Sequence, residues 1–165
     1  MIKVVSRLAS LMIVAGALVF FSNCGGDDPK DPAQKVQLEK LSKTWTILSA
    51  HLGSDERTSD FETPDFTLTI TGTFNSNSPD GNYNFSVGGN RPDPSPWPAN
   101  GQWKFITTGA GDSGAIQRIG DGITMSYSIN SSGQLNLTFN CPIGVCNYDG
   151  DRNKEVNGNW TFVLN

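Results

Sequence analysis

The sequence has only one histidine, His51, and few charged residues, because Asp, Glu, Lys and Arg make up 17% of its 165 residues. A single histidine makes a zinc site or a histidine-based catalytic site a poor expectation. The formal net charge of −4 argues against a nucleic-acid partner. The chain also lacks a Ser–His–Asp arrangement, a phosphate-binding loop and a dinucleotide fingerprint. We therefore expect no enzymatic activity, no metal site and no cofactor.

Helix-forming residues are scarce relative to Thr, Gly and aromatic residues, which indicates β structure rather than a helix bundle. The length is that of a single domain.

One long apolar run stands near the N-terminus, at residues 8–21, and follows the basic residues Lys3 and Arg7. Its fourteen residues are few for a helix that must span a hydrocarbon core of about 30 Å. The pattern is typical of a secretory signal, so we expect residues 1–23 to be a signal peptide and not part of the fold.

A lone cysteine, Cys24, follows this run and precedes Gly25 and Gly26. The arrangement resembles the lipobox of bacterial lipoproteins, in particular those of Bacteroidota, in which the thiol receives a diacylglyceryl group. Asn23 departs from the small residue usual before that cysteine. The resemblance implies a lipid anchor in the bacterial outer membrane, with residues 24–34 as a flexible lipidated tether. An unmodified thiol after cleavage and an uncleaved anchor helix are the alternatives.

Asp27 and Asp28 follow the two glycines. In lipoproteins of Bacteroidota an acidic cluster near the lipidated cysteine is associated with export to the cell surface. The resemblance therefore implies exposure on the cell surface, and the membrane is the expected first partner of the chain.

Residues 35–165 are expected to form one β domain. One short helix is expected over residues 33–43, ahead of the first strand. Apolar and polar residues alternate strictly in seven segments, at residues 45–47, 66–71, 82–87, 103–105, 123–129, 135–140 and 160–164, with a weaker candidate at 115–119. Short turns rich in Gly, Asp and Ser separate them. These features predict an antiparallel up-and-down barrel of about eight strands, and a two-sheet β-sandwich is the alternative. Leu48 breaks the alternation of the first segment and predicts a bulge or a bend.

The apolar face of each strand would point into the barrel and form a candidate ligand-binding interior. Its main residues are Trp45, Phe66, Leu68, Tyr83, Phe85, Trp103, Met125, Tyr127, Leu137, Phe139 and Trp160. We expect no Lys, Arg or His among the inward residues. A barrel of eight strands is just wide enough for its side chains to fill it or for one small ligand. The sequence leaves both interpretations open, a cavity for a small apolar ligand or a packed core.

The proline-rich loop between residues 88 and 101 is a candidate interaction loop, with Arg91 and Trp97 as its main residues. Prolines restrict the loop to an extended course and reduce the entropy lost on binding. Trp97 could stack on a sugar or insert into a protein partner. The alternative is that Trp97 folds back and caps one end of the barrel.

Two further cysteines, Cys141 and Cys146, are separated by four residues that include Pro142 and Gly144. In an exported protein this pair predicts a structural disulfide. A redox or metal site would need partner residues that the sequence does not supply.

A short helix leading into Leu41 to Trp45, followed by about eight strands, resembles the lipocalin-like (calycin-type) lipoproteins of Bacteroidota over residues 38–165. Lys43 stands at the position of the glycine in the lipocalin Gly-x-Trp motif, so only Trp45 matches the motif here. Gly-x-Trp-x-Phe occurs at residues 101–105 and 158–162. The resemblance implies a barrel that binds a small apolar ligand. The alternative function is a surface module that binds a glycan or a protein through the Trp97 loop, over a packed core.

We expect Cys24→Ser to abolish metabolic labelling with palmitate, because a serine offers no thiol to receive the diacylglyceryl group. A variant that lacks Cys141 and Cys146 is the control and should keep the label. Labelling that persists in Cys24→Ser would contradict the lipid anchor.

Overall fold

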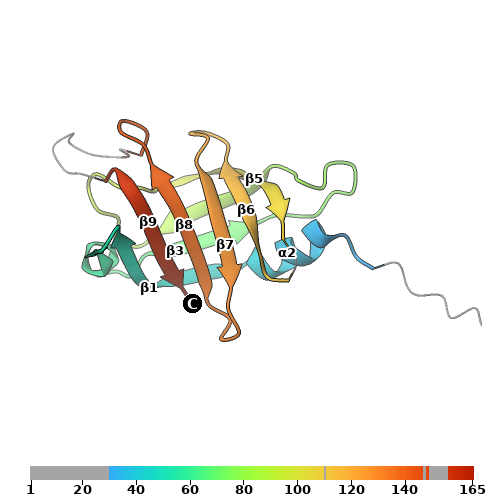
Figure 1. Cartoon of the computed structure of the whole chain (residues 1–165), viewed down its shortest axis with the longest axis horizontal. Coiled ribbons are helices and arrows are strands. Elements are labelled where there is room, and N and C mark those ends of the chain that lie inside the picture. The colour runs from blue at the N-terminus through green and yellow to red at the C-terminus, as the bar shows by residue number, and fades with distance from the viewer. Residues whose placement is uncertain (1–29, 110, 147, 149–155) are drawn as a thin grey trace, which may run out of the picture. The chain divides into compact units, whose positions relative to one another are not determined.

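The computed structural model describes residues 30–109, 111–146, 148 and 156–165 (Figure 1). The chain divides into two units, Met1–Asp31 and Pro32–Asn165, and the fold described below belongs to the second. The expected signal peptide, Cys24 and most of the tether lie outside the described residues. Among the residues that are described, no helix has the length and apolar character needed to cross a membrane.

The first element is the helix α2, Ala33–Leu41, which begins directly after Pro32. Proline suits a helix start because its fixed φ is helical and its missing N–H would have no partner there. Leu38 and Leu41 are buried on one face of the helix, together with the side chain of Gln37. The predicted helix is confirmed, although it ends two residues earlier than expected.

Nine strands and one short 3₁₀ helix follow. They are β1 (Thr44–Leu52), β2 (Asp55–Glu56), η1 (Thr58–Phe61), β3 (Thr67–Thr71), β4 (Tyr83–Gly88), β5 (Asn100–Thr108), β6 (Ser113–Arg118), β7 (Thr124–Ile129), β8 (Leu135–Cys141) and β9 (Gly158–Leu164). The alternating segments of the sequence thus form strands, and the weaker candidate at residues 115–119 belongs to β6.

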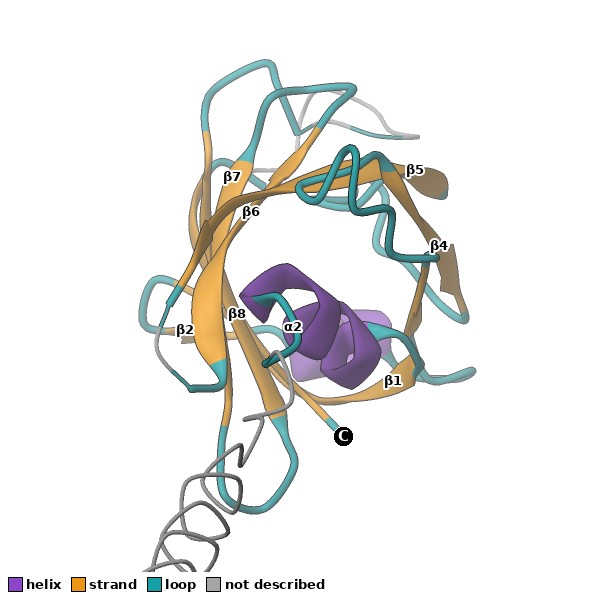
Figure 2. Cartoon of the chain, turned by 90° about the vertical axis from the view of Figure 1, so that its right-hand side faces the viewer, coloured by secondary structure: helices purple, strands orange, loops and turns teal. Residues whose placement is uncertain are grey.

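The sheet closes into a barrel. From β3 onwards each strand pairs antiparallel with the next one in the chain, and β1 pairs with both β3 and β9. The two-residue strand β2 only extends β1 as a hairpin. Figure 2 shows the strands as a ring around α2. The predicted eight-stranded up-and-down barrel is confirmed, because a sandwich would leave β1 and β9 apart.

The bulge predicted from Leu48 is also confirmed. The register between β1 and β9 shifts between Ile47 and Ser49, and Leu48 is 46% exposed. The extra residue lets Ile47 and Ala50 both point into the core.

The interior of the barrel is filled. All eleven residues of the predicted interior are at most 5% exposed. The void among them measures about 10 Å³ and is lined by apolar side chains, Trp97 and Met125 included. That volume is about the size of one water probe, so the packed core, and not an open cavity, describes this structure.

Polar contacts fix α2 to one end of the barrel, here called the helix end. Gln37 accepts a hydrogen bond from the Tyr127 hydroxyl at 3.1 Å and donates to the carbonyl of Gly111. Lys40 pairs with Asp112 in the same β5–β6 connection. Burial raises the pKa of Tyr127 to about 12. The helix therefore plugs the barrel with the buried side chain of Gln37 hydrogen-bonded.

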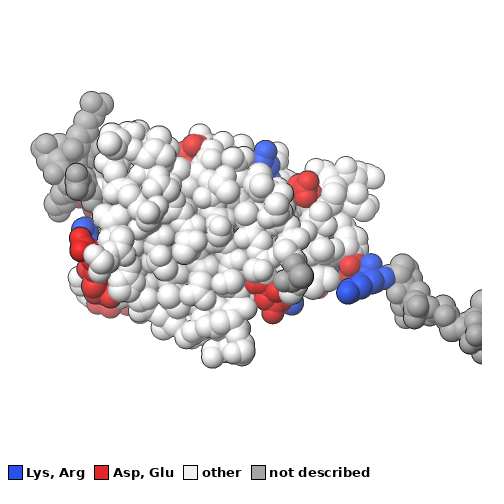
Figure 3. Space-filling model, in the orientation of Figure 1, with Lys and Arg blue, Asp and Glu red and all other residues white. Residues whose placement is uncertain are grey.

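The outward face of the wall is polar but uncharged over β7, β8 and β9. Its side chains are mostly Thr, Ser and Asn, and the centre of this face carries no charge in the view of Figure 3. Such a face is well solvated and presents no strong electrostatic field to a partner.

Candidate functional site: the loop end of the barrel

The end of the barrel opposite α2, here called the loop end, is covered by two loops. Residues 89–99 connect β4 to β5, and the described residues 142–146 and 148 follow β8. The two loops are joined by an antiparallel bridge in which the amides of Ser95 and Tyr148 each donate to the other's carbonyl, at 2.9 and 3.2 Å. Irregular segments far apart in sequence thus form one cover.

Trp97 comes from this cover and points into the barrel, where it is 1% exposed. Its ring centroid lies 5.3 Å from that of Phe139, 5.6 Å from Phe162 and 6.0 Å from Phe66. The indole ring is therefore not an exposed platform for a sugar or a protein, and the alternative that it folds back onto the barrel holds. Its Nε1–H has no hydrogen-bond partner among the residues that the structure describes.

Two polar contacts hold the loop in this course. Arg91 Nη1 donates to the carbonyl of Trp97 at 3.0 Å, and the Trp97 amide donates to Ser95 Oγ at 3.1 Å. Arg91, the other residue of the predicted interaction loop, thus supports the backbone that inserts Trp97.

A buried arginine, Arg118, lies beneath the cover, and this corrects the expectation that the interior holds no cation. It is 1% exposed, lies two residues after Ile116 on the inward face of β6, and its guanidinium stands 5.3 Å above the Trp97 ring. Side chains point alternately to the two faces of a strand, so Arg118 lies on the same face as the inward-pointing Ile116. This alternation, applied to the weaker candidate segment at residues 115–119, would have placed Arg118 inside the barrel. Burial lowers the pKa of Arg118, and the charge of Asp121 opposes that shift.

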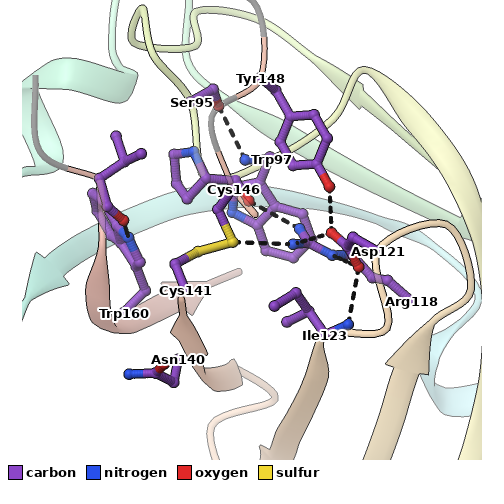
Figure 4. Close-up of a disulfide and its surroundings, with 12 residues drawn as sticks. Ser95, Trp97, Arg118, Asp121, Ile123, Asn140, Cys141, Cys146, Tyr148 and Trp160 are labelled. Atoms are coloured by element: carbon purple, nitrogen blue, oxygen red, sulfur yellow. Dashed lines mark hydrogen bonds and ion pairs between the residues drawn. A yellow bond between two sulfur atoms is a disulfide. The ribbon is translucent and has the colours of Figure 1, made fainter. Parts of the chain in front are cut away.

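Asp121 compensates the buried charge and links three parts of the loop end. Its carboxylate lies 2.6 Å from Arg118 Nη2 and accepts the Ile123 amide at 3.0 Å and the Tyr148 hydroxyl (Figure 4). Burial, together with this hydrogen bond and the charge of Asp121, raises the pKa of Tyr148 to about 12. The β6–β7 turn and the cover are thereby held together.

The predicted disulfide between Cys141 and Cys146 is present, with 5.5 Å between the two Cα atoms. Both cysteines are at most 1% exposed, and Cys146 Sγ lies 3.7 Å from Arg118 Nη2. The loop that the disulfide closes exposes Ile143, which is 87% exposed. The disulfide therefore fixes a short projecting tip at the loop end.

Two surface hollows open beside the cover. The first, here called the mouth pocket, has a volume of about 200 Å³ and is bordered by Phe85, Pro98, Asn100, Gln102, Gly120 and Tyr148. The Arg118–Asp121 pair lies at its base. The second hollow, of about 330 Å³, is lined mainly by charged and polar residues, including Asp60 and Arg91. The predicted interaction loop thus contributes residues to both hollows although its tryptophan is buried.

No group of three or more His, Cys, Asp or Glu side chains that could hold a metal ion is found in the described part of the chain. No family model, curated protein or solved structure matches the sequence or the fold of this chain.

We predict that Asp121→Asn lowers the free energy of unfolding by about 3–5 kcal/mol, because it leaves the Arg118 guanidinium buried without a counter-charge. Denaturant unfolding monitored by circular dichroism measures this change.

Asp60→Asn is the matched control. Asp60 pairs with Arg57 at 2.6 Å in a partly exposed position, and the loss of such a pair costs less than about 1 kcal/mol. Equal losses for the two variants would contradict the role of Asp121. The double variant Arg118→Met/Asp121→Asn should recover part of the loss, since it removes the buried charge itself.

Proposed function

We propose that this chain is a non-enzymatic lipoprotein of the bacterial outer membrane, whose solid barrel presents the loop end to a partner outside the membrane. The observation that carries the proposal is that the open volume lies in surface hollows and not inside the barrel. The void found among the described interior residues measures about 10 Å³, whereas hollows of about 200 and 330 Å³ open at the loop end. Binding residues lie disproportionately on loops that a rigid scaffold positions, and a packed barrel is such a scaffold.

The connectivity of the chain supports this arrangement. Cys24 precedes the first residue of α2 by nine residues, and an extended chain of that length reaches about 30 Å at most. A diacylated Cys24 therefore tethers the barrel through its helix end. The loop end, at the opposite pole of the barrel, is the part left accessible to partners.

A second function is favoured by one observation at Trp97. A buried indole N–H without a partner costs roughly 1–3 kcal/mol, and Trp97 belongs to a loop rather than to a strand. A small apolar ligand with one hydrogen-bond acceptor could displace the indole and occupy the same apolar chamber. In this alternative the lipocalin-like interior binds a ligand only after the loop between residues 89 and 99 withdraws.

The loop-end proposal is tested by a photo-reactive phenylalanine at Ile143 in the full chain on intact cells. Because Ile143 projects from the loop end, we expect ultraviolet light to produce discrete adducts of higher mass on a denaturing gel.

Ser131 is the control position, because it is exposed on the β7–β8 turn at the helix end. It should give no adduct. Equal adducts from both positions, or adducts from Ser131 alone, would contradict recognition at the loop end.

A further inference from the structure

We propose that the mouth pocket binds a single uncharged sugar residue. This inference rests on the proposed function, since it names the ligand class of one hollow at the loop end. Three properties of the pocket carry it: an apolar floor, a rim of neutral hydrogen-bonding groups, and a pair of charges that cancel each other.

The floor is aromatic. Phe85 packs across the strand from Gly101, where a Cβ would lie 2.8 Å from its ring, so glycine is needed for the ring to cover this position. Pro98 and the ring of Tyr148 extend the apolar surface. The C–H face of a sugar ring packs on such surfaces, because an aromatic ring combines a large apolar area with a weakly negative face.

The rim is formed by amide side chains on one strand. β5 begins at Asn100 and pairs with β4 from that residue, but its pairing with β6 begins only three residues later, at Trp103 and Arg118. The first residues of β5 therefore border the pocket on the side of β6. Asn100 and Gln102 are both exposed and lie on the same side of β5, and Gln102 Nε2 donates to Asn84 Oδ1 at 3.4 Å, which leaves its Oε1 as an acceptor. An amide group both donates and accepts hydrogen bonds, which matches vicinal hydroxyl groups that do the same.

The charges at the base exclude an ionic ligand as the preferred occupant. Arg118 and Asp121 lie 2.6 Å apart and compensate each other. An anion or a cation would therefore lose its hydration shell without meeting an unpaired opposite charge. A purely apolar ligand would cover polar groups of the rim without forming hydrogen bonds to them, which disfavours it for the same reason.

The volume sets the size of the ligand. About 200 Å³ is below the range of roughly 300–1,000 Å³ typical of sites for larger molecules. The pocket suits one ring, either free or at the end of a longer glycan. An aromatic side chain of a peptide is the competing occupant of this size. It would pack on the apolar floor but form no hydrogen bonds with the amide groups of the rim.

The test is a titration of the ¹⁵N-labelled full chain in phosphocholine micelles, which carry no sugar head group. Neutral hexoses, N-acetylhexosamines, deoxyhexoses and pentoses are added at millimolar concentration. We expect at least one of them to shift the side-chain amides of Asn100 and Gln102 and the backbone amide of Gly120, whereas uronic acids should bind no better.

A blocking variant makes the test specific. A Cβ added at Gly120 meets no atom within 4 Å, and its backbone is not in the left-handed region, so Gly120→Phe can fill the pocket without strain. We expect it to weaken sugar binding at least about tenfold, which corresponds to about 1.4 kcal/mol. Ser131→Phe at the helix end is the matched control and should bind like the original chain.

The remaining outcomes separate this inference from the function on which it rests. Shifts caused by N-acetyltryptophanamide and by no sugar would overturn the sugar assignment in favour of a peptide side chain. Shifts outside the pocket, equal binding by Gly120→Phe, or no shift with any sugar would overturn it as well. In each of these cases, adducts at Ile143 would still support recognition at the loop end, and their absence would remove the function itself.

Discussion

The insertion of Trp97 into the barrel is the interaction on which the rest of the loop end depends. Its ring occupies the space that the strands leave between Phe66, Phe85, Phe139 and Phe162, with centroid distances of 5.3–6.2 Å. Without it the eight strands would enclose an apolar void, which is costly because interiors are packed to near-crystalline density. Because Trp97 comes from a connection rather than from a strand, filling the core also draws residues 89–99 across the barrel.

That course brings together the other features of the site. Pro96, next to Trp97, accepts a hydrogen bond from Arg118 at 2.9 Å, and Ser95 forms the bridge to Tyr148. Arg118 is tolerated in the core because Asp121 compensates it, and Asp121 in turn holds Tyr148 beside the mouth pocket. The same cover therefore completes the packing of the barrel and shapes its surface hollows. The helix end is filled by α2 instead, and the connection between β3 and β4, residues 72–82, lies beside that helix.

The elements that follow from periodicity could be predicted from the sequence. Alternation located the strands, Pro32 located the start of α2, Leu48 located the bulge, and the spacing of Cys141 and Cys146 indicated their disulfide. Consecutive short turns favoured closure into a barrel over a two-sheet sandwich, and the pairing of β1 with β9 confirms it.

The candidate site was less predictable, because it lies on loops and on one exception to the pattern. Arg118 lies on the same inward face of β6 as Ile116. However, the charge of Arg118 and the small residues before it gave this strand the weakest alternation of apolar and polar residues in the sequence. Gln37 faces the barrel as a polar residue on a short helix, where its hydrogen bonds with Tyr127 and Gly111 explain its burial. Whether Trp97 points inward or outward depends on the volume enclosed by the strands, and that volume is set by the tilt and stagger of the barrel.

The occupancy of the barrel by Trp97 is tested most directly with crystals of the chain and of its Trp97→Ala variant under xenon pressure, because xenon enters apolar cavities and is visible in electron density. The account predicts no xenon inside the original barrel, whose void is about 10 Å³, and an ordered xenon site between Leu68, Met125 and Leu137 in Trp97→Ala. Xenon in the barrel of the original chain would contradict the packed core. A variant interior that stays free of xenon would contradict the role of Trp97 in filling it.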